Sequence, residues 1–380
     1  MNGLFDPSGP KVYSIPAGAN FLAELTRTLA DETGLKDHPE ALADALIYVP
    51  HRRSERALGF ALHQAAGGTA CLLPNIRALG DLETDEPPPS AEAALADLPP
   101  VISPAARIGE LPKLVMHYFK HTERHMPAGA CLAAARELAR LLDQAALSGE
   151  IDWGALDQMV PNAQLARHWQ QSLEFLDIIT RQWPAYLQNT MQMDPYARRL
   201  EAARAMAAHW QTAPPDAPVI IAGSTGATPA SRLLMQAAMA MPNGLIVLPG
   251  LDTDLGTRTL EHVSETPSHP QFTLARTLKA LGLKPDQEAP WPGLTESDLR
   301  KARQRLDHQA LAPAQRPASE TPHNSPPHGD ADSAAFVRNA VDGLTVLDAA
   351  DDTQEALLTA MLMRETLEKD GQTAALVTPD

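Results

Sequence analysis

The sequence predicts an α/β protein whose parallel sheet is interrupted by a long helical segment. Three observations predict this class. Short apolar runs closed by Pro or Gly recur along the chain, at residues 12–15, 45–49, 219–222 and 245–248. The first three runs each precede a segment with helical spacing of apolar residues, which is the order of elements that builds a parallel sheet. Residues 105–209, by contrast, contain only helical patterns.

The N-terminal region contains two strand–helix units in succession. The expected elements are a strand at 12–15, a helix at 21–35, a strand at 45–49, a helix at 53–65 and a third strand at 71–73. Pro16 and Pro50 close the first two strands, because proline cannot donate to a sheet. Gly34 stands where the first helix is expected to stop.

The helical segment separates this region from a second set of strands. An acidic, Pro-rich stretch at 81–100 marks its start, and the sheet pattern returns abruptly at Pro218. The expected elements are then a strand at 219–222, a loop at 223–227, a helix at 229–241 and a strand at 245–248. The helical segment is therefore expected to be inserted within one α/β domain.

The C-terminal part is expected to begin a second α/β domain. Residues 312–333 are rich in Pro, Ser, His and Asp, which is typical of a flexible linker. A strand at 344–347, a helix at 353–368 and a strand at 373–377 follow, so the sheet would be unfinished and the chain part of a longer protein. The expected organisation is a disordered leader at 1–10, an α/β domain at 11–85 and 218–311, an inserted helical domain at 100–217, the linker at 312–333, and a truncated second α/β domain at 334–380.

Composition indicates a globular protein of the cytoplasm. Hydrophobic residues make up 44% of the 380 residues, which is enough to build a core. Cys71 and Cys131 are the only cysteines, too few for a disulfide framework or a four-thiolate metal site. We expect neither a signal peptide nor a membrane helix, since no apolar run approaches ~20 residues. The formal net charge of −16 argues only weakly against nucleic acid, because phosphate binding depends on local basic patches.

Two strand-to-helix loops occupy the places where an ATP-dependent motor carries its Walker A and Walker B residues. The first loop, at 16–20, contains Gly18 but has neither the Lys that reaches the phosphates nor the Ser/Thr that holds Mg²⁺. It is either an ordinary turn capped by Asn20 or a degenerate phosphate loop. The second contains Ser224 and Thr225 and has no carboxylate at the strand end. It is either a plain turn or a receptor for an anion such as a DNA phosphate.

A cluster of arginines follows the second expected strand. Arg52, Arg53 and Arg56 lie where that strand ends and the next helix starts. The carboxyl end of a parallel strand is where open α/β sheets place their ligands, so these side chains are candidates for contacts to a phosphate backbone. The alternative is a solvated basic turn.

Metal binding is weakly indicated at two places. His117, His121 and His125 recur every four residues, but a zinc site needs further ligands, and a solvated helix face explains the spacing. Asp252 and Asp254 resemble an acidic metal loop only superficially. Since no catalytic constellation of Ser/His/Asp, Cys/His or paired carboxylates is recognisable, we expect no catalytic residue, no metal and no cofactor in this chain.

Taken in order, eight segments resemble the N-terminal part of AddB subunits, the partners of AddA in the alphaproteobacterial AddAB helicase–nuclease. They are VYSIPAGANF at 12–21, LIYVPHRRSER at 46–56, LLPNIRALGD at 72–81, VISPAAR at 101–107, VIIAGSTGATPAS at 219–231, LIVLPGLDTD at 245–254, HPQF at 269–272 and TAALVTPD at 373–380. Each match is weak alone, and the order and spacing carry the resemblance.

The resemblance implies a superfamily 1 helicase-like fold with 1A-, 1B- and 2A-like domains that no longer hydrolyses ATP. Gly18 and Asn20 would belong to the relic of motif I, 223–226 would lie near the relic of motif II, and Arg52 and Arg53 would lie near motif Ia. The implied partners are single- and double-stranded DNA and an AddA-type ATPase, in double-strand break repair by homologous recombination. The family's iron–sulfur cluster and Mg²⁺ belong to a nuclease domain that would follow residue 380.

Two other readings of the residues stay open. One is a nucleotide-binding enzyme with a non-standard phosphate loop, and the other is a structural α/β module without a role on DNA. A measurement of ATP binding distinguishes the nucleotide-binding enzyme from a helicase-like DNA scaffold. Salt-dependent DNA binding distinguishes the structural module from that scaffold.

Overall fold

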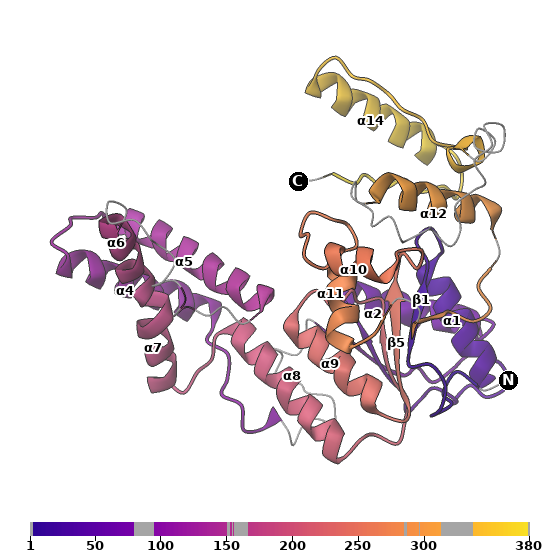
Figure 1. The fold of residues 1–380 in the computed structure, drawn as a ribbon, viewed down its shortest axis with the longest axis horizontal. Coiled ribbons are helices and arrows are strands. Elements are labelled where there is room, and N and C mark those ends of the chain that lie inside the picture. Colours follow the sequence, from indigo (N-terminus) through magenta and orange to yellow (C-terminus); the bar gives the residue numbers. More distant parts are fainter. Residues whose placement is uncertain are drawn as a thin grey trace. The chain divides into compact units, whose positions relative to one another are not determined.

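The computed structural model describes residues 3–79, 95–149, 153, 155, 166–284, 287–295, 297–312 and 337–378. The chain divides into two compact units, Met1–Pro326 and Pro327–Asp380, and each is described by itself. Figure 1 shows their elements in sequence colours.

Within the described residues, the first unit contains one sheet of six parallel strands. Its strands are β1 (Val12–Ile15), β2 (Leu46–Val49), β3 (Asn75–Ala78), β4 (Val219–Ala222), β5 (Gly244–Pro249) and β6 (Ala289–Pro290). Their order across the sheet is β3-β2-β4-β5-β1-β6. The register aligns Ile220 of β4 with Ile47 on one side and Leu245 on the other. This confirms the α/β class and the parallel sheet.

Helices cover both faces of the sheet. Helices α1 (Phe21–Thr33) and α2 (Arg52–Ala65) pack on one face, where Leu25, Leu29, Leu58 and Leu62 join one apolar core. The other face is covered by α8 (Pro195–Thr212), α9 (Pro229–Ala240), α10 (Thr257–Val263) and α11 (Phe272–Leu281). Each fully buried Leu, Ile or Val contributes about 1.5–3 kcal/mol relative to exposure, so the two cores hold the layers together.

The bounds of α1 follow from local chemistry. The side chain of Asn20 accepts a hydrogen bond from the backbone N–H of Ala23 at 3.2 Å, which caps the first turn. Gly34 ends the helix with φ 65°, a left-handed conformation that glycine adopts readily. Both features confirm the expectation from sequence.

The described residues between β3 and β4 are mainly helical. They form α4 (Pro104–His121), α5 (Ala128–Ser148), α6 (Ala166–Asp177), a π-helix η3 (Ile178–Gln182), α7 (Trp183–Asn189) and α8. Apart from α8, these helices share a separate apolar core around Leu111, Leu138 and Trp183. Arg107 of α4 ties them together, since its Nη2 lies 2.7 Å from Asp143 Oδ1 of α5. No helix among the described residues is long and apolar enough to cross a lipid bilayer.

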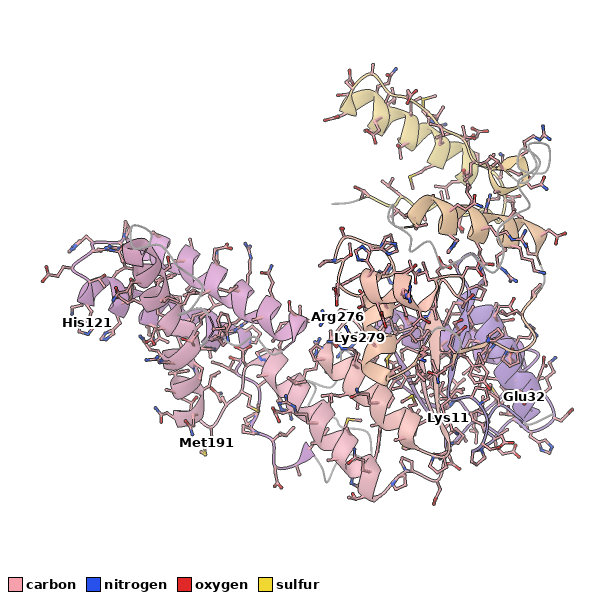
Figure 2. The ribbon with its side chains drawn as sticks, viewed as in Figure 1. Lys11, Glu32, His121, Met191, Arg276 and Lys279 are labelled. Carbon is pink, nitrogen blue, oxygen red and sulfur yellow. The ribbon has the colours of Figure 1, made fainter. Side chains whose placement is uncertain are left out.

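The structure differs from two expectations in the N-terminal region. The third strand lies at 75–78 and not at 71–73, where Leu72 and Leu73 are exposed. Residues 3–10 form turns and not a disordered leader. Leu4 is buried against the α1–α2 core, and its N–H donates to the carboxylate of Glu32, which Figure 2 labels, at 3.2 Å.

Four further elements had no sequence prediction: the helices α10, α11 and α12 (Asp298–Leu311), and the two-residue strand β6. The expected linker at 312–333 falls outside the described residues except for its first position, as does most of the acidic stretch at 81–100.

The second unit contains the expected helix, α14 (Asp352–Leu367). Neither expected strand is paired in the described residues 337–378. Val346 and Val377, which belong to those segments, are 88% and 92% exposed. A strand is stabilised by hydrogen bonds to a neighbour, and the described part of this unit supplies none. The expectation of a second α/β domain is therefore met only in its helix.

The start of β5 gives a test of the packing. A methyl group on Gly244 would lie 1.7 Å from the carbonyl oxygen of Ala238 in α9, so Gly244→Ala is expected to destabilise the protein by about 3 kcal/mol. Gly109→Ala, in the exposed interior of α4 with open space around it, is the control and is expected to stabilise by about 0.5–1 kcal/mol. The midpoint of urea unfolding measures both, and equal midpoints would contradict the close contact.

Candidate functional site

The carboxyl ends of the strands define the candidate site. Because all pairs in the sheet are parallel, the loops that leave β1, β2, β4 and β5 gather at one edge. The chain leaves β2 outward to β3 through α2 on one face, and leaves β4 in the opposite direction to β5 through α9 on the other face. Such a reversal between neighbouring strands creates the crevice where open α/β sheets bind ligands.

The loop after β1 is closed by its own residues. Asn20 caps α1, and Phe21 turns its ring toward the loop after β4, where a methyl group on Gly223 would lie 3.2 Å from Cε1 of Phe21. The same methyl group would lie 3.7 Å from Cδ of Pro50, so the loops after β1, β2 and β4 pack together. A phosphate loop would place an anion at the start of α1. Here a side-chain cap and an aromatic ring occupy that place.

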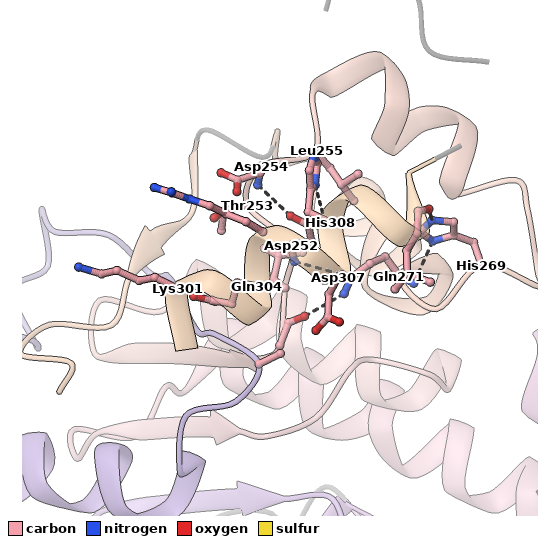
Figure 3. A pocket seen from close by; sticks show the side chains of 15 residues that line it. Asp252, Thr253, Asp254, Leu255, His269, Gln271, Lys301, Gln304, Asp307 and His308 are labelled. Carbon is pink, nitrogen blue, oxygen red and sulfur yellow. Dashed lines mark hydrogen bonds and ion pairs between the residues drawn. The ribbon is translucent and has the colours of Figure 1, made fainter. Parts of the chain in front are cut away.

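Helix α12 (Asp298–Leu311) lies beside the same loop, and Figure 3 shows Lys301, Gln304 and His308 of this helix around a pocket. A methyl group on Gly18 would lie 3.4 Å from Cγ of Arg300, which shows how closely α12 approaches. The buried ring of His308 bonds through Nδ1 to Asp252 Oδ2 at 2.8 Å, and this contact fastens α12 to the loop after β5. A cavity of about 510 Å³ lies between them, with Gln271, Lys301 and Arg305 in its lining.

The Asp252 carboxylate has a structural role in this arrangement. Its Oδ1 accepts a hydrogen bond from the N–H of Asp254 at 3.0 Å, and its Oδ2 bonds His308.

The rings of His117 and His121 lie edge to face at 4.3 Å between centroids. Among the described residues, no group of three or more His, Cys, Asp or Glu side chains is placed to hold a metal ion.

The loop after β4 is held by several hydrogen bonds, and its Ser224 side chain is buried. The Ser224 hydroxyl is buried and accepts a hydrogen bond from the N–H of Gly226 at 3.2 Å. The carbonyl of Thr225 accepts from Thr277 Oγ1 of α11 at 2.7 Å, and Thr228 caps α9. Ser224 is therefore a poor candidate for a DNA contact, because its hydroxyl is used within the loop. Thr225 is half-buried at the edge.

The arginines after β2 are exposed. Arg52, Arg53 and Arg56 lie in the first turns of α2, and neither Arg53 nor Arg56 has a carboxylate partner among the described residues. His51 gives α2 no side-chain cap, in contrast to Asn20 on α1. The β2–β4 pairing thus brings the arginine cluster and the 223–228 loop to adjacent strand ends.

Phe60 extends the arginine cluster and was missed from the sequence. It lies four residues after Arg56 on α2, and 66% of its surface is exposed. A large apolar side chain in that position, beside unpaired cations, offers a face for stacking. The signal in the sequence was the helical spacing of Phe60 from Arg56 and Arg53.

No known family model matches this sequence, and no curated protein matches it either.

The hydrogen bond between His308 of α12 and Asp252 of the β5 loop gives a test of how α12 is held in place. His308→Ala removes the hydrogen bond between α12 and the Asp252 carboxylate. The free energy of local unfolding of α12 is therefore expected to fall by about 1–2 kcal/mol. Amide hydrogen exchange over 299–311 should become roughly tenfold faster. Gln309→Ala, an exposed position on the same helix, is the control. Equal exchange in the two variants would show that His308 does not hold α12.

Proposed function

We propose that this chain is the helicase-like, non-catalytic region of an AddB-type subunit, a scaffold that contacts DNA during double-strand break repair by homologous recombination. One observation carries the proposal. The start of α1, where a motor would hold nucleotide, is capped by Asn20 and packed by Phe21 with α12 beside it, while Arg53 and Arg56 are exposed at the neighbouring crevice. The ATP-hydrolysing partner would be an AddA-type subunit in the cytoplasm.

The strand order supports this proposal. In a P-loop motor, the Walker A loop follows a strand and opens a helix, as the 16–20 loop does here. The loops after β1 and β4 lie on either side of β5, and they touch through Phe21 and Gly223. We take the first as the relic of motif I and the second as lying near motif II. The helices between β3 and β4 then correspond to a 1B-like insertion, and the second unit to part of a 2A-like domain.

The surface of α2 supports a role on DNA. Arg53 and Arg56 have the long reach and permanent charge that suit phosphate contacts. Phe60 adds an exposed ring, and proteins that hold single strands combine such cations with aromatic side chains on which bases stack. With a net charge of −16, the chain as a whole repels a polyanion, so contact is confined to a local basic surface of this kind.

One observation favours the alternative of a nucleotide-binding enzyme. The cavity beneath α12 adjoins the β1 loop, and Lys301 and Arg305 contribute to its lining. Asp252, Asp254 and Asp307 line it as well and oppose a phosphate there, which makes the scaffold the better supported function.

ATP binding separates the two functions. In isothermal titration of the full chain with ATP and Mg²⁺, we expect no heat of binding, because Asn20 and Phe21 occupy the start of α1. DNA should not stimulate hydrolysis. Saturable ATP binding that is lost in Gly18→Val would contradict the scaffold proposal and favour the alternative.

DNA binding tests the arginine surface. Arg53→Gln/Arg56→Gln should weaken binding of a fluorescein-labelled single-stranded 20-mer and lower the slope of log K against log salt by about 1.4, roughly 0.7 for each phosphate contact. Phe60→Ala should weaken it by about 1–3 kcal/mol with the slope unchanged, since stacking releases no counterions.

Lys113→Gln, an exposed cation that pairs with Glu110 in α4, is the matched control and should leave affinity and slope unchanged. Binding that is identical in the wild type and in Arg53→Gln/Arg56→Gln would contradict the placement of DNA on α2.

A further inference from the structure

A second pair of arginines lies at the loop after β4, on the face of the sheet opposite α2. Arg232 comes from the first turn of α9, and its Nη1 donates to the carbonyls of Gly226 at 2.7 Å and Ala227 at 3.2 Å. Arg276 lies on α11 beside Thr277, whose hydroxyl donates to the Thr225 carbonyl at 2.7 Å. The 225–227 loop therefore fixes the helix positions that carry both guanidinium groups.

The two arginines lie near the same loop without a balancing carboxylate. Neither Arg232 nor Arg276 has an acidic partner among the described residues. Arg232 is half-buried, and burial first, with the nearby charge of Arg276 second, lowers its pKa. Holding two like charges together is unfavourable, and a bound anion between them would remove that cost.

The neighbouring groups leave this pair open to an anion. Cζ of Arg276 lies 5.4 Å from the centre of the Phe272 ring, which orients the guanidinium and leaves its charge unneutralised. Lys279, one turn further along α11, lies 3.9 Å from Glu265 and is balanced by it. Figure 2 labels Arg276 and Lys279 on this side of the molecule.

We propose that Arg232 and Arg276 form a phosphate site for the backbone of a nucleic-acid strand. The proposal rests on the proposed function and adds a second contact to it. Since β2 and β4 are neighbours, α2 and the 225–227 loop flank the same crevice from opposite faces. A strand that crosses the carboxyl edge meets Arg53 and Arg56 on one side and this pair on the other. Arg232, tethered to two carbonyls, is already ordered before the strand binds.

The test uses the full chain and the variant Arg276→Gln, because Arg276 is exposed and its replacement leaves the loop bonds of Arg232 in place. Affinity for the fluorescein-labelled single-stranded 20-mer should fall about three- to tenfold at low salt, and the slope of log K against log salt should fall by about 0.7. Adding Arg53→Gln/Arg56→Gln should lower the slope by about 2.1 in total. Arg140→Gln, an exposed arginine of α5 that pairs with Glu137, is the control and should change neither quantity.

Three results would overturn the proposal, and they are distinguishable. If Arg276→Gln binds like the wild type while Arg53→Gln/Arg56→Gln binds more weakly, this site is wrong and the proposed function stands. If the wild type binds no DNA, both fail. If calorimetry shows inorganic pyrophosphate binding that is lost in Arg276→Gln while DNA affinity is unchanged, the site takes a small anion and the nucleic-acid assignment is wrong.

Discussion

The central strand β4 is the element on which the rest of the first unit depends. Its four residues, Val219 to Ala222, are all buried, because helices cover both faces of the sheet at that point. It pairs with β2 on one side and with β5 on the other, and so joins the N-terminal strands to those that follow the helical segment. This pairing with β2 places the loops after β2 and β4 next to each other. The crevice, the arginines on α2 and the tethered Arg232 all take their positions from it.

The same constraint explains why the start of α1 is capped and packed by side chains of the chain itself while the start of α2 is not. Parallel pairing forces the loops after β1, β4 and β5 together, and the residues present at those loops decide what they hold. Phe21 packs toward Gly223, and Asn20 caps the start of α1, so side chains of the chain itself take the positions where a motor would bind phosphate. On α2 the equivalent helix start has no side-chain cap and carries Arg52 and Arg53. The proposed scaffold role follows from that contrast.

Electrostatic repulsion and attraction would both affect how such a scaffold binds DNA. The acidic chain repels a polyanion at long range, and salt screens this repulsion along with the attraction of the arginines. Affinity would then depend on a few short-range contacts, which suits a subunit that is held on DNA by a partner. Avidity from the partner would raise the effective concentration of the strand at the crevice.

The sequence alone determined the local structure and the class of fold. Apolar runs closed by Pro or Gly located β1, β2, β4 and β5, and Asn20 and Gly34 bounded α1, because these signals depend on residues a few positions apart. The sequence also placed the arginines at a strand end. It missed β6, the α10–α12 helices and the start of β3, which lies after Pro74 and not before it.

Only the tertiary structure decided strand order and the direction of side chains. The contact of Phe21 with Gly223, the bond from Thr277 to the Thr225 carbonyl and the proximity of Arg276 to Arg232 join segments that are far apart in the chain. No local pattern encodes such contacts, because they arise from packing between whole elements. The loop at 16–20 illustrates the division: its missing Walker residues could be read from the sequence, whereas the ring and the helix that occupy their place required the fold.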